Sequence, residues 1–348
     1  MTKQRAKWPY VLLIILIILV VILEFVQVPY YVHKPGTADK LESMVHVKGG
    51  YQDQGTMRLV TIYEIKANLL QYLIAKYDFN KYTDVYKVSQ IQLPDETQQE
   101  LNVRNLNDMK TAQDSATYVA YKAAGRNPTI KQLGIKVLDI NSEMPAKKVL
   151  EPSDLIIEAN GKPIHTINDF KKEIKGAKAG QKVQLKIKRG NETKTVSTQL
   201  AKFPKDWQTS GQSDEVGLGI VESDDVKVSV TPPVTFNTQG IGGPSAGLMM
   251  TLEIYNQLTP SDLSKGYNIC GTGTMDFDGT VGPIGGIEEK IVAANKEGVD
   301  IFFAPVADHE AKDAEATVKD IHSKIKVVPV KTFDDALNYL KNLKEKKS

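Results

Sequence analysis

The feature that most limits how this chain can fold is a long apolar run near its start. Residues 8–23 carry no charge, and beyond Glu24 the run continues through Phe25, Val26 and Val28. As a helix rising about 1.5 Å per residue, residues 8–28 would reach roughly 30 Å, the thickness of the hydrocarbon core of a bilayer. We therefore predict a transmembrane helix over residues 8–28.

The charges beside this run indicate its orientation. Lys3, Arg5 and Lys7 precede it, and no basic residue follows for several positions, so the positive-inside rule places the N-terminus in the cytoplasm. The remaining chain is then expected outside the cell, anchored by a single pass through the cytoplasmic membrane. A cleaved signal peptide is the alternative, but residues 28–32 are bulky and aromatic where a cleavage site needs small residues.

Length and composition bound the rest of the molecule. A chain of 348 residues exceeds the usual size of one core, so we expect an α+β multidomain fold. A formal net charge of +2 gives no reason to expect nucleic acid as a partner. The single cysteine, Cys270, excludes an intramolecular disulfide and a cysteine-based zinc site, and the five histidines form no His-Glu-x-x-His motif. We therefore predict no metal and no cofactor.

Residues 29–125 are expected to form an extracytoplasmic segment of extended and helical stretches. Apolar residues recur at helical spacing in residues 62–77 and again in residues 112–124. Neither stretch contains a recognisable group of reactive side chains. We expect these helices to pack beside the domain that follows.

Short strands dominate the next domain, residues 126–202. Residues 135–140 and 155–159 are rich in β-branched side chains, and Asn160-Gly161 is a turn signal. Apolar residues alternate with polar ones over residues 183–187, while residues 167–174 have helical spacing.

This succession resembles a bacterial PDZ domain. Leu133-Gly134-Ile135 is similar to the carboxylate-binding loop, Met144-Pro145-Ala146 to the helical turn after it, and residues 150–164 to the Gly-Asp-x-Ile-x-x-x-Asn-Gly-x-x-Ile core. Two features depart from the family. Ser153 replaces the usual glycine before Asp154, and the first loop lacks the full Gly-Leu-Gly-Ile pattern.

The resemblance implies a groove for an extended peptide, because PDZ domains accept such a peptide as an added strand. We expect this groove between residues 135–138 and a helix that bears Phe170 and Ile174. The residues expected to line it are Leu133, Gly134, Ile135, Val137, Phe170 and Ile174. The alternative for Phe170 and Ile174 is that they fill the core of the small domain.

A polar linker over residues 203–214 leads into the last domain, residues 210–345. Within it, residues 239–258 place glycines and a proline directly before an apolar helix. We expect Pro244 at the first helical position and Ser245 at the helix N-terminus, where free N–H groups favour an oxyanion. Gly243 would let a substrate carbonyl approach the backbone.

A second stretch, residues 271–305, contains a lysine on an apolar stripe. Lys290 shares one face of an expected helix with Ile287, Ile291 and Ala294. Such a lysine either snorkels outward or loses its hydration, and loss of hydration lowers the pKa of its ammonium group. A neutral lysine can take a proton from a serine hydroxyl, so both possibilities stay open at this point.

Together the two stretches resemble the proteolytic domain of the Lon family. Residues 243–247 read Gly-Pro-Ser-Ala-Gly, and residues 272–290 read Thr-Gly-x-x-x-x-x-Gly-x-Val-x-Pro-Ile-Gly-Gly-x-x-Glu-Lys. The resemblance implies Ser245 as nucleophile and Lys290 as its general base. It also implies supporting roles for Thr272, beside the lysine, and Gly243, whose N–H with that of Ser245 would hold the oxyanion. Thr274 stands where the family usually has an acidic residue.

The order of anchor, PDZ domain and Lon-type domain resembles the ATP-independent PDZ-Lon proteases of Gram-positive bacteria. The sequence has no Gly-x-x-x-x-Gly-Lys-[Ser/Thr] phosphate loop, so we expect no nucleotide as a partner. The resemblance implies a serine endopeptidase with a Ser-Lys dyad. Its polypeptide substrates would be extended segments of secreted or cell-surface peptides and proteins.

Two other functions stay open. Residues 243–247 also fit the Gly-x-Ser-x-Gly elbow of esterases, which needs a strand before the serine and a downstream acid and histidine. Asp300 or Asp308 with His309 or His322 are the candidates for those partners. The other alternative is a membrane-tethered PDZ adaptor with an inactive protease-like domain.

Overall fold

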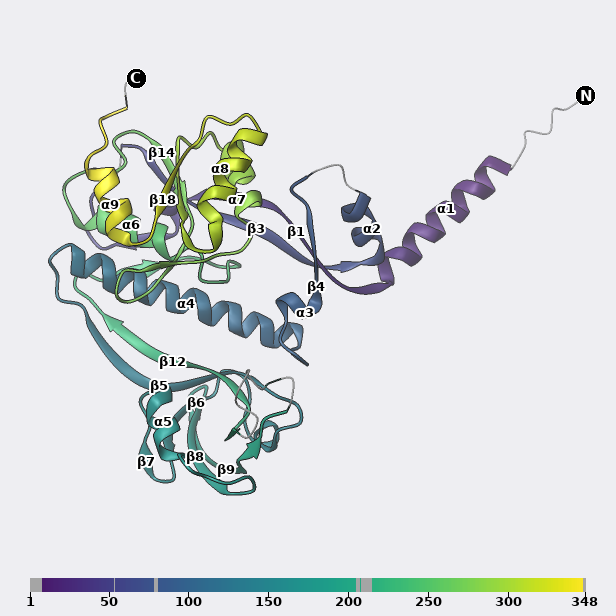
Figure 1. The fold of residues 1–348 in the computed structure, drawn as a ribbon, viewed down its shortest axis with the longest axis vertical. Helices are drawn as coiled ribbons and strands as arrows, with labels where there is room; N and C mark the ends of the chain where they lie inside the picture. The colour runs from purple at the N-terminus through teal and green to yellow at the C-terminus, as the bar shows by residue number, and fades with distance from the viewer. Residues whose placement is uncertain (1–7, 53, 78–80, 205–206, 208–214, 347–348) are drawn as a thin grey trace, which may run out of the picture.

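The computed structural model describes residues 8–52, 54–77, 81–204, 207 and 215–346. Lys3, Arg5 and Lys7, on which the predicted orientation rests, and the predicted domain start at residue 210 lie outside the described residues. The chain has three parts: a projecting helix, a body to which both ends of the chain contribute, and a second body built from the middle of the chain (Figure 1).

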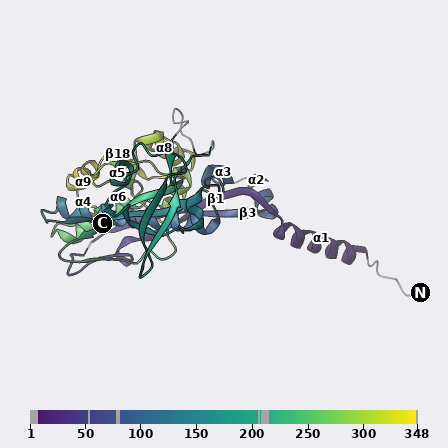
Figure 2. The ribbon, with the colours of Figure 1, turned by 90° about the horizontal axis from the view of Figure 1, so that it is seen from below.

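The apolar run forms helix α1 (Trp8–Phe25), 18 residues long. Apart from the half-buried Leu23, the exposed apolar side chains of α1 range from 38% exposed at Val20 to 79% at Phe25, and Figure 2 shows the helix pointing away from both bodies. In the part of the chain that the structure describes, no helix is long and apolar enough to cross a membrane. The predicted span over residues 8–28 is corrected accordingly: the helix ends at Phe25, because Gln27 already pairs with Asn68 in a sheet.

One six-stranded sheet unites the N-terminal segment with the C-terminal region. Its order is β18-β17-β14-β3-β1-β4. The strands are β1 (Gln27–Lys40), β3 (Thr56–Asn68), β4 (Asp84–Lys87), β14 (Asn268–Gly271), β17 (Ile301–Pro305) and β18 (Lys326–Val330). β3 and β14 pair in parallel at the centre, with Thr56 opposite Asn268, so residues 29–125 supply three strands to the sheet that also carries the last domain.

The predicted helix over residues 62–77 is wrong in its first half. Residues 62–68 continue strand β3, and helix α2 covers only Leu69–Tyr77. Ile62 and Ile65 pair with Pro35 and Val32 of β1. β-branched side chains suit such a ladder, and pairing with distant strands overrides the helical spacing of the apolar residues.

The predicted helix over residues 112–124 is part of a longer helix, α4 (Gln98–Ala123). Thr97 begins it with a capping box: its side chain accepts a hydrogen bond from the N–H of Glu100, whose carboxylate accepts one from the N–H of Thr97. This helix lies between the two bodies (Figure 1).

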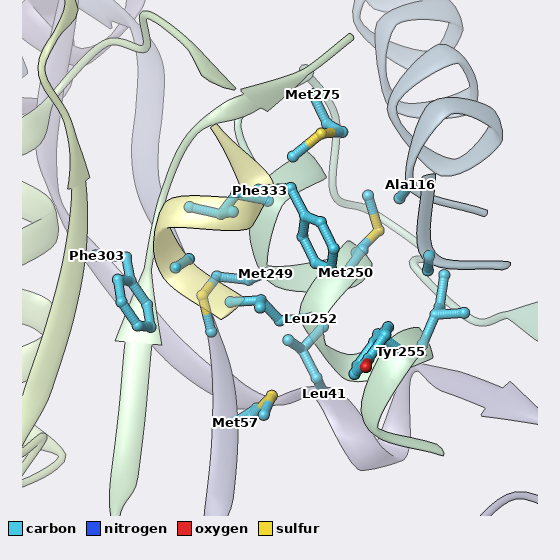
Figure 3. Close-up of a cluster of buried hydrophobic side chains, with 14 of the residues drawn as sticks. Leu41, Met57, Ala116, Met249, Met250, Leu252, Tyr255, Met275, Phe303 and Phe333 are labelled. Atoms are coloured by element: carbon cyan, nitrogen blue, oxygen red, sulfur yellow. The ribbon is translucent and has the colours of Figure 1, made fainter. Parts of the chain in front are cut away.

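Helices cover both faces of the sheet because successive strand residues point to opposite sides. Ile269 and Phe303 pack with α4, α6 (Gly247–Leu258) and α9 (Phe333–Lys341), in the cluster of buried side chains shown in Figure 3. Their neighbours Cys270 and Phe302 pack with α7 (Ile287–Lys296) and α8 (Glu310–Asp320). Helix α6, which follows Ser245, and helix α7, which carries Lys290, thus pack on opposite faces of one sheet.

Shorter elements complete this body. They are the helix α3 (Val88–Ile91), the pair β2 (Val45–Val47) with β13 (Val234–Phe236), the pair β15 (Thr274–Met275) with β16 (Val281–Gly282), and the 3-10 turns Leu41–Ser43 and Ala307–His309.

The second body is a separate sheet of order β12-β5-β6-β8-β9, in which β7 also pairs with β6. Its elements are β5 (Thr129–Ile140), the 3-10 turn Pro145–Lys148, β6 (Leu155–Ala159), β7 (Lys162–Pro163), α5 (Ile167–Glu173), β8 (Lys182–Arg189), β9 (Glu192–Gln199), β10 (Ala201–Lys202), β11 (Val216–Gly217) and β12 (Ile220–Ser229). The predicted strands, helix and turn are confirmed. Asn160 and Gly161 both have positive φ, and Val183, Leu185 and Ile187 are the buried residues of β8.

A two-stranded ribbon joins this body to the first. β5 leaves the end of α4, and β12 returns antiparallel to it from Ile220 opposite Ile140 to Ser229 opposite Thr129. The Lys110 ammonium of α4 contacts Asp225 at 3.3 Å and donates a hydrogen bond to the carbonyl of Val226. The returning strand leads through β13 to the loop that contains Ser245.

Candidate functional site

Ser245 lies in a turn immediately before helix α6. The helix begins at Gly247, so Pro244 is not its first residue, and the predicted start of the helix is corrected by three residues. Gly247 must be small, because a Cβ there would lie 2.7 Å from the Cβ of Met275. Every residue of α6 is buried, so packing in the core holds the helix that follows the Ser245 turn.

Hydrogen bonds hold the Ser245 turn against the segment that follows β14. The Ser245 carbonyl accepts from the Gly273 N–H at 2.9 Å and from the Thr272 hydroxyl at 3.1 Å. The Gly273 carbonyl in turn accepts from the Leu248 N–H at 3.0 Å. The sequence places these residues 27 positions apart, and the structure brings them into direct contact.

Lys290 lies on the buried side of α7. The helix begins after Gly286, which has a φ of 70°. Only 2% of Lys290 is exposed, and its Nζ donates to the Thr272 hydroxyl at 3.1 Å. The lysine therefore does not snorkel to solvent, and one hydroxyl group separates its amine from the Ser245 backbone.

Burial lowers the pKa of Lys290 to about 8, because the ammonium form loses its hydration. Three groups act in the opposite direction: Glu310, Glu289 and Cys270 each raise the pKa of Lys290 through their charge. The balance leaves a lysine that is substantially neutral slightly above neutral pH, which is the form that can accept a proton.

The donors available for an oxyanion differ from those expected. The Gly243 N–H is engaged, because it donates to the carbonyl of Asn105 on α4 at 2.8 Å. Within the described part of the chain, the N–H groups of Ser245 and Ala246 donate to no protein atom. Of the expected donors around Gly243 and Ser245, the Ser245 N–H stays available, and the Ala246 N–H takes the place of the engaged Gly243 N–H.

The esterase alternative lacks its required geometry. Residues 239–244, which precede Ser245, form no strand, so the strand-to-helix elbow is absent. Among the described residues, no hydrogen bond joins His309 or His322 to Ser245, and both histidines are exposed on the surface. The same residues contain no group of His, Cys, Asp and Glu side chains placed to hold a metal ion.

The predicted peptide groove beside residues 135–138 is also relocated. These residues belong to β5, which pairs with β12 on one edge and β6 on the other, so Ile135 already faces both Asp224 and Ile156. An interior strand has no free edge for a peptide. Phe170 is only 7% exposed and Ile174 packs against the same core, so both follow the alternative of filling the domain interior.

The free edge belongs to β12 instead. It is the last strand of its sheet, and the Asp224 carboxylate accepts a hydrogen bond from the Ile167 N–H of α5 at 2.6 Å. The loop before it reads Gly217-Leu218-Gly219-Ile220, the full family pattern that Leu133-Gly134-Ile135 lacks. Gly219 has a φ of 66°, and a Cβ there would meet Met144 at 2.2 Å.

Sequence reasoning thus missed three parts of this arrangement. The signal for the loop at residues 217–220 was present as a plain Gly-Leu-Gly-Ile string beyond the linker. Asn105 and Glu310 carry no motif, because each acts through a contact that only the folded chain creates.

Comparison with known families agrees with this division of the chain. Residues 101–200 match the PDZ domain family, and residues 220–342 match the C-terminal proteolytic domain of Lon protease (S16). Among solved structures, the PDZ domain of an SdrC-like protein from Listeria innocua is 30% identical, with 26% of this chain and 92% of that chain covered and a TM-score of 0.23.

The similar Lon proteases match only part of this chain. The Lon protease of Trichlorobacter lovleyi is 38% identical over 27% of this chain and 11% of its own length. That of Malacoplasma penetrans is 32% identical over 38% of this chain and 18% of its own length. The chain thus spans less than a fifth of either relative. It combines a PDZ domain with a Lon-type C-terminal proteolytic domain.

Proposed function

We propose that this protein is a serine endopeptidase in which Ser245 is the nucleophile and Lys290 its general base. The observation that carries the proposal is the Thr272 hydroxyl, which accepts from the buried Lys290 amine and donates to the Ser245 carbonyl, both at 3.1 Å. This bridge holds a desolvated amine beside the serine. The match of residues 220–342 to a serine peptidase domain supports the same reading.

The chemistry requires two proton transfers in each of its two half-reactions and one covalent intermediate. Neutral Lys290 takes the proton of the Ser245 hydroxyl while the serine oxygen bonds to the scissile carbonyl carbon. The N–H groups of Ser245 and Ala246 hold the resulting oxyanion. Lys290 then gives its proton to the departing amine as the C–N bond breaks, which leaves an ester on Ser245. In the second half-reaction Lys290 takes a proton from the water molecule that attacks this ester and gives it to the Ser245 oxygen as the acid product leaves.

The substrates proposed for this site are extended segments of peptides and proteins, cut without ATP. The absence of a phosphate-loop motif from the 348 residues supports this, since no nucleotide-driven unfolding would be available within them. The free edge of β12 beside α5 would bind such a segment as an added strand, through main-chain hydrogen bonds.

We also propose that α1 inserts its apolar surface into the cytoplasmic membrane, with both bodies on the outer side. A contiguous surface of exposed Leu, Ile and Val side chains is unfavourable in water and marks an interaction with lipid or protein.

Removal of either member of the dyad should abolish peptide hydrolysis. We expect Ser245→Ala and Lys290→Ala each to lower kcat/KM by about 10³-fold or more, since either change removes covalent catalysis. Hydrolysis of a fluorogenic peptide measures the loss, and circular dichroism checks the fold. His322→Ala is the control and should retain activity; a fully active Lys290→Ala would contradict the proposal.

The pH dependence should follow Lys290. Since burial lowers its pKa to about 8, the neutral form is lost as pH falls below that value. The value of kcat/KM should therefore rise about tenfold per pH unit between pH 6 and 8 and level off above. A profile that continues to rise beyond pH 10 would indicate a solvated lysine and would contradict the assignment.

The β12 edge should affect long substrates more than short ones. Asp224→Ala removes the hydrogen bond to Ile167 and should raise KM for casein about five- to tenfold, with little change for a short fluorogenic peptide. Asp224→Asn keeps an acceptor and is the matched control. Equal losses in kcat/KM on both substrates would mean that the PDZ domain supports the protease fold instead of recruiting substrate.

Membrane attachment should depend on α1. The full chain should sediment with membranes, and protease added to intact cells should degrade both bodies, because they are expected outside. A chain that starts at Gln27 and carries a secretion signal should appear in the medium. Recovery of the full chain in a soluble fraction, or its full protection from added protease, would count against this localisation.

A further inference from the structure

Glu310 is a buried carboxyl group near the base that belongs to no motif recognised in the sequence. It is the first residue of α8 and is only 5% exposed. Its Oε1 accepts a hydrogen bond from the Ile284 N–H at 2.7 Å. Its Oε2 is buried without a hydrogen-bond partner among the residues that the structure describes. A carboxylate oxygen left in this state is costly, so a functional reason is expected.

The two residues directly before Glu310 have strained backbone conformations. Asp308 and His309 have φ values of 47° and 65°, which residues other than glycine rarely adopt. Such conformations persist only where surrounding contacts compensate for their cost. Glu310 follows these two residues directly, and its carboxylate lies against the Ile284 segment.

The Ile284 segment leads directly into the helix of the base. Gly286 caps α7, and the Lys290 N–H donates to the Gly286 carbonyl at 3.0 Å. By accepting the Ile284 N–H, Glu310 ties this loop to α8 and so helps determine where α7 begins. The position of the Lys290 amine relative to Thr272 depends on that start.

The Glu310 charge also acts on the amine. Among the groups that raise the pKa of Lys290, Glu310 acts most strongly, ahead of Glu289 on α7 and Cys270 on β14. Reciprocally, burial raises the pKa of Glu310, while Lys290 lowers it and Asp308 and Asp313 raise it further. In the described part of the chain, no carboxylate lies within 4.0 Å of the Lys290 Nζ. Glu310 and Glu289 therefore act on the positive charge of Lys290 without forming an ion pair with it.

We propose that Glu310 is a positioning residue for the reaction: it holds the loop before α7 and supplies the negative charge that stabilises the Lys290 ammonium formed when Ser245 loses its proton. This inference rests on the proposed Ser245 and Lys290 dyad. The trade-off is that the same charge reduces the neutral fraction of Lys290 near neutral pH, while it favours the protonated amine once the serine has attacked.

Glu310→Gln tests the charge separately from the structural contact. Glutamine keeps an oxygen for the Ile284 N–H and nearly the same volume. We expect the acid limb of the kcat/KM profile of a short fluorogenic peptide to move to lower pH by about 0.5–1 unit, because an opposite charge near Lys290 is lost. We also expect kcat on the high-pH plateau to fall about tenfold.

Glu315→Gln, on the exposed side of the same helix, makes the same chemical change away from Lys290; it is the matched control and should leave the profile and kcat unchanged. A folded Glu310→Gln protein with the acid limb and kcat of the unmodified protein would overturn the inference. If Glu310→Gln does not fold, Glu310→Asp withdraws the charge from the amine and should shift the limb in the same direction; an unshifted limb with unchanged kcat would again overturn it.

Failure of the underlying dyad gives a different result. If Ser245→Ala or Lys290→Ala remains active, the proposed function fails whatever Glu310→Gln does. If both are inactive while Glu310→Gln behaves as the unmodified protein, only the role of Glu310 is lost.

Discussion

The structure depends on one contact, the hydrogen bond from the buried Lys290 amine to the Thr272 hydroxyl. An ammonium group without water is unfavourable, so the fold must either neutralise it or surround it with compensating charge. This molecule does both in part: burial lowers the pKa of Lys290 to about 8, and Glu310 and Glu289 limit the shift. The amine is consequently held near the point where it can gain and lose a proton at physiological pH.

That contact is possible because the helices that position Lys290 and Ser245 pack against the same sheet. Lys290 approaches from the face covered by α7 and α8, while the Ser245 turn belongs to the face covered by α4 and α6. Thr272 follows directly after the central strand β14, at the strand end where the two faces meet. β14 is paired on one side with β3, so the N-terminal segment is part of the framework that holds the site.

The PDZ domain is linked to this framework through the same elements. It is inserted between α4 and the Ser245 loop, and β12 runs from its free edge toward that loop. Helix α4 contacts both ends of this path: Lys110 contacts Asp225 of β12, and the Asn105 carbonyl accepts the Gly243 N–H beside Ser245. The position of the PDZ domain and the shape of the serine loop therefore share one supporting helix.

Local sequence patterns determined the elements whose reasons are local. The strands and turn of the PDZ domain followed from alternation and from Asn160-Gly161, because side-chain period and positive φ are properties of neighbouring residues. The place of Lys290 on an apolar stripe left two possibilities, burial or snorkelling to solvent, and the fold buries it. Ser245 and Lys290 were predicted as nucleophile and base because residues 243–247 and 272–290 resemble two motifs of the Lon family.

Only the tertiary structure decided what depends on partners distant in sequence. Residues 62–68 became strand because β1 pairs with them, and the PDZ edge became β12 because it covers β5. The Gly243 N–H is engaged by Asn105, 138 positions earlier, and Glu310 acts on Lys290 across two helices. The physical reason is that hydrogen-bond partners, burial and charge compensation are set by which segments meet in space, and a local pattern contains no information about its future neighbours.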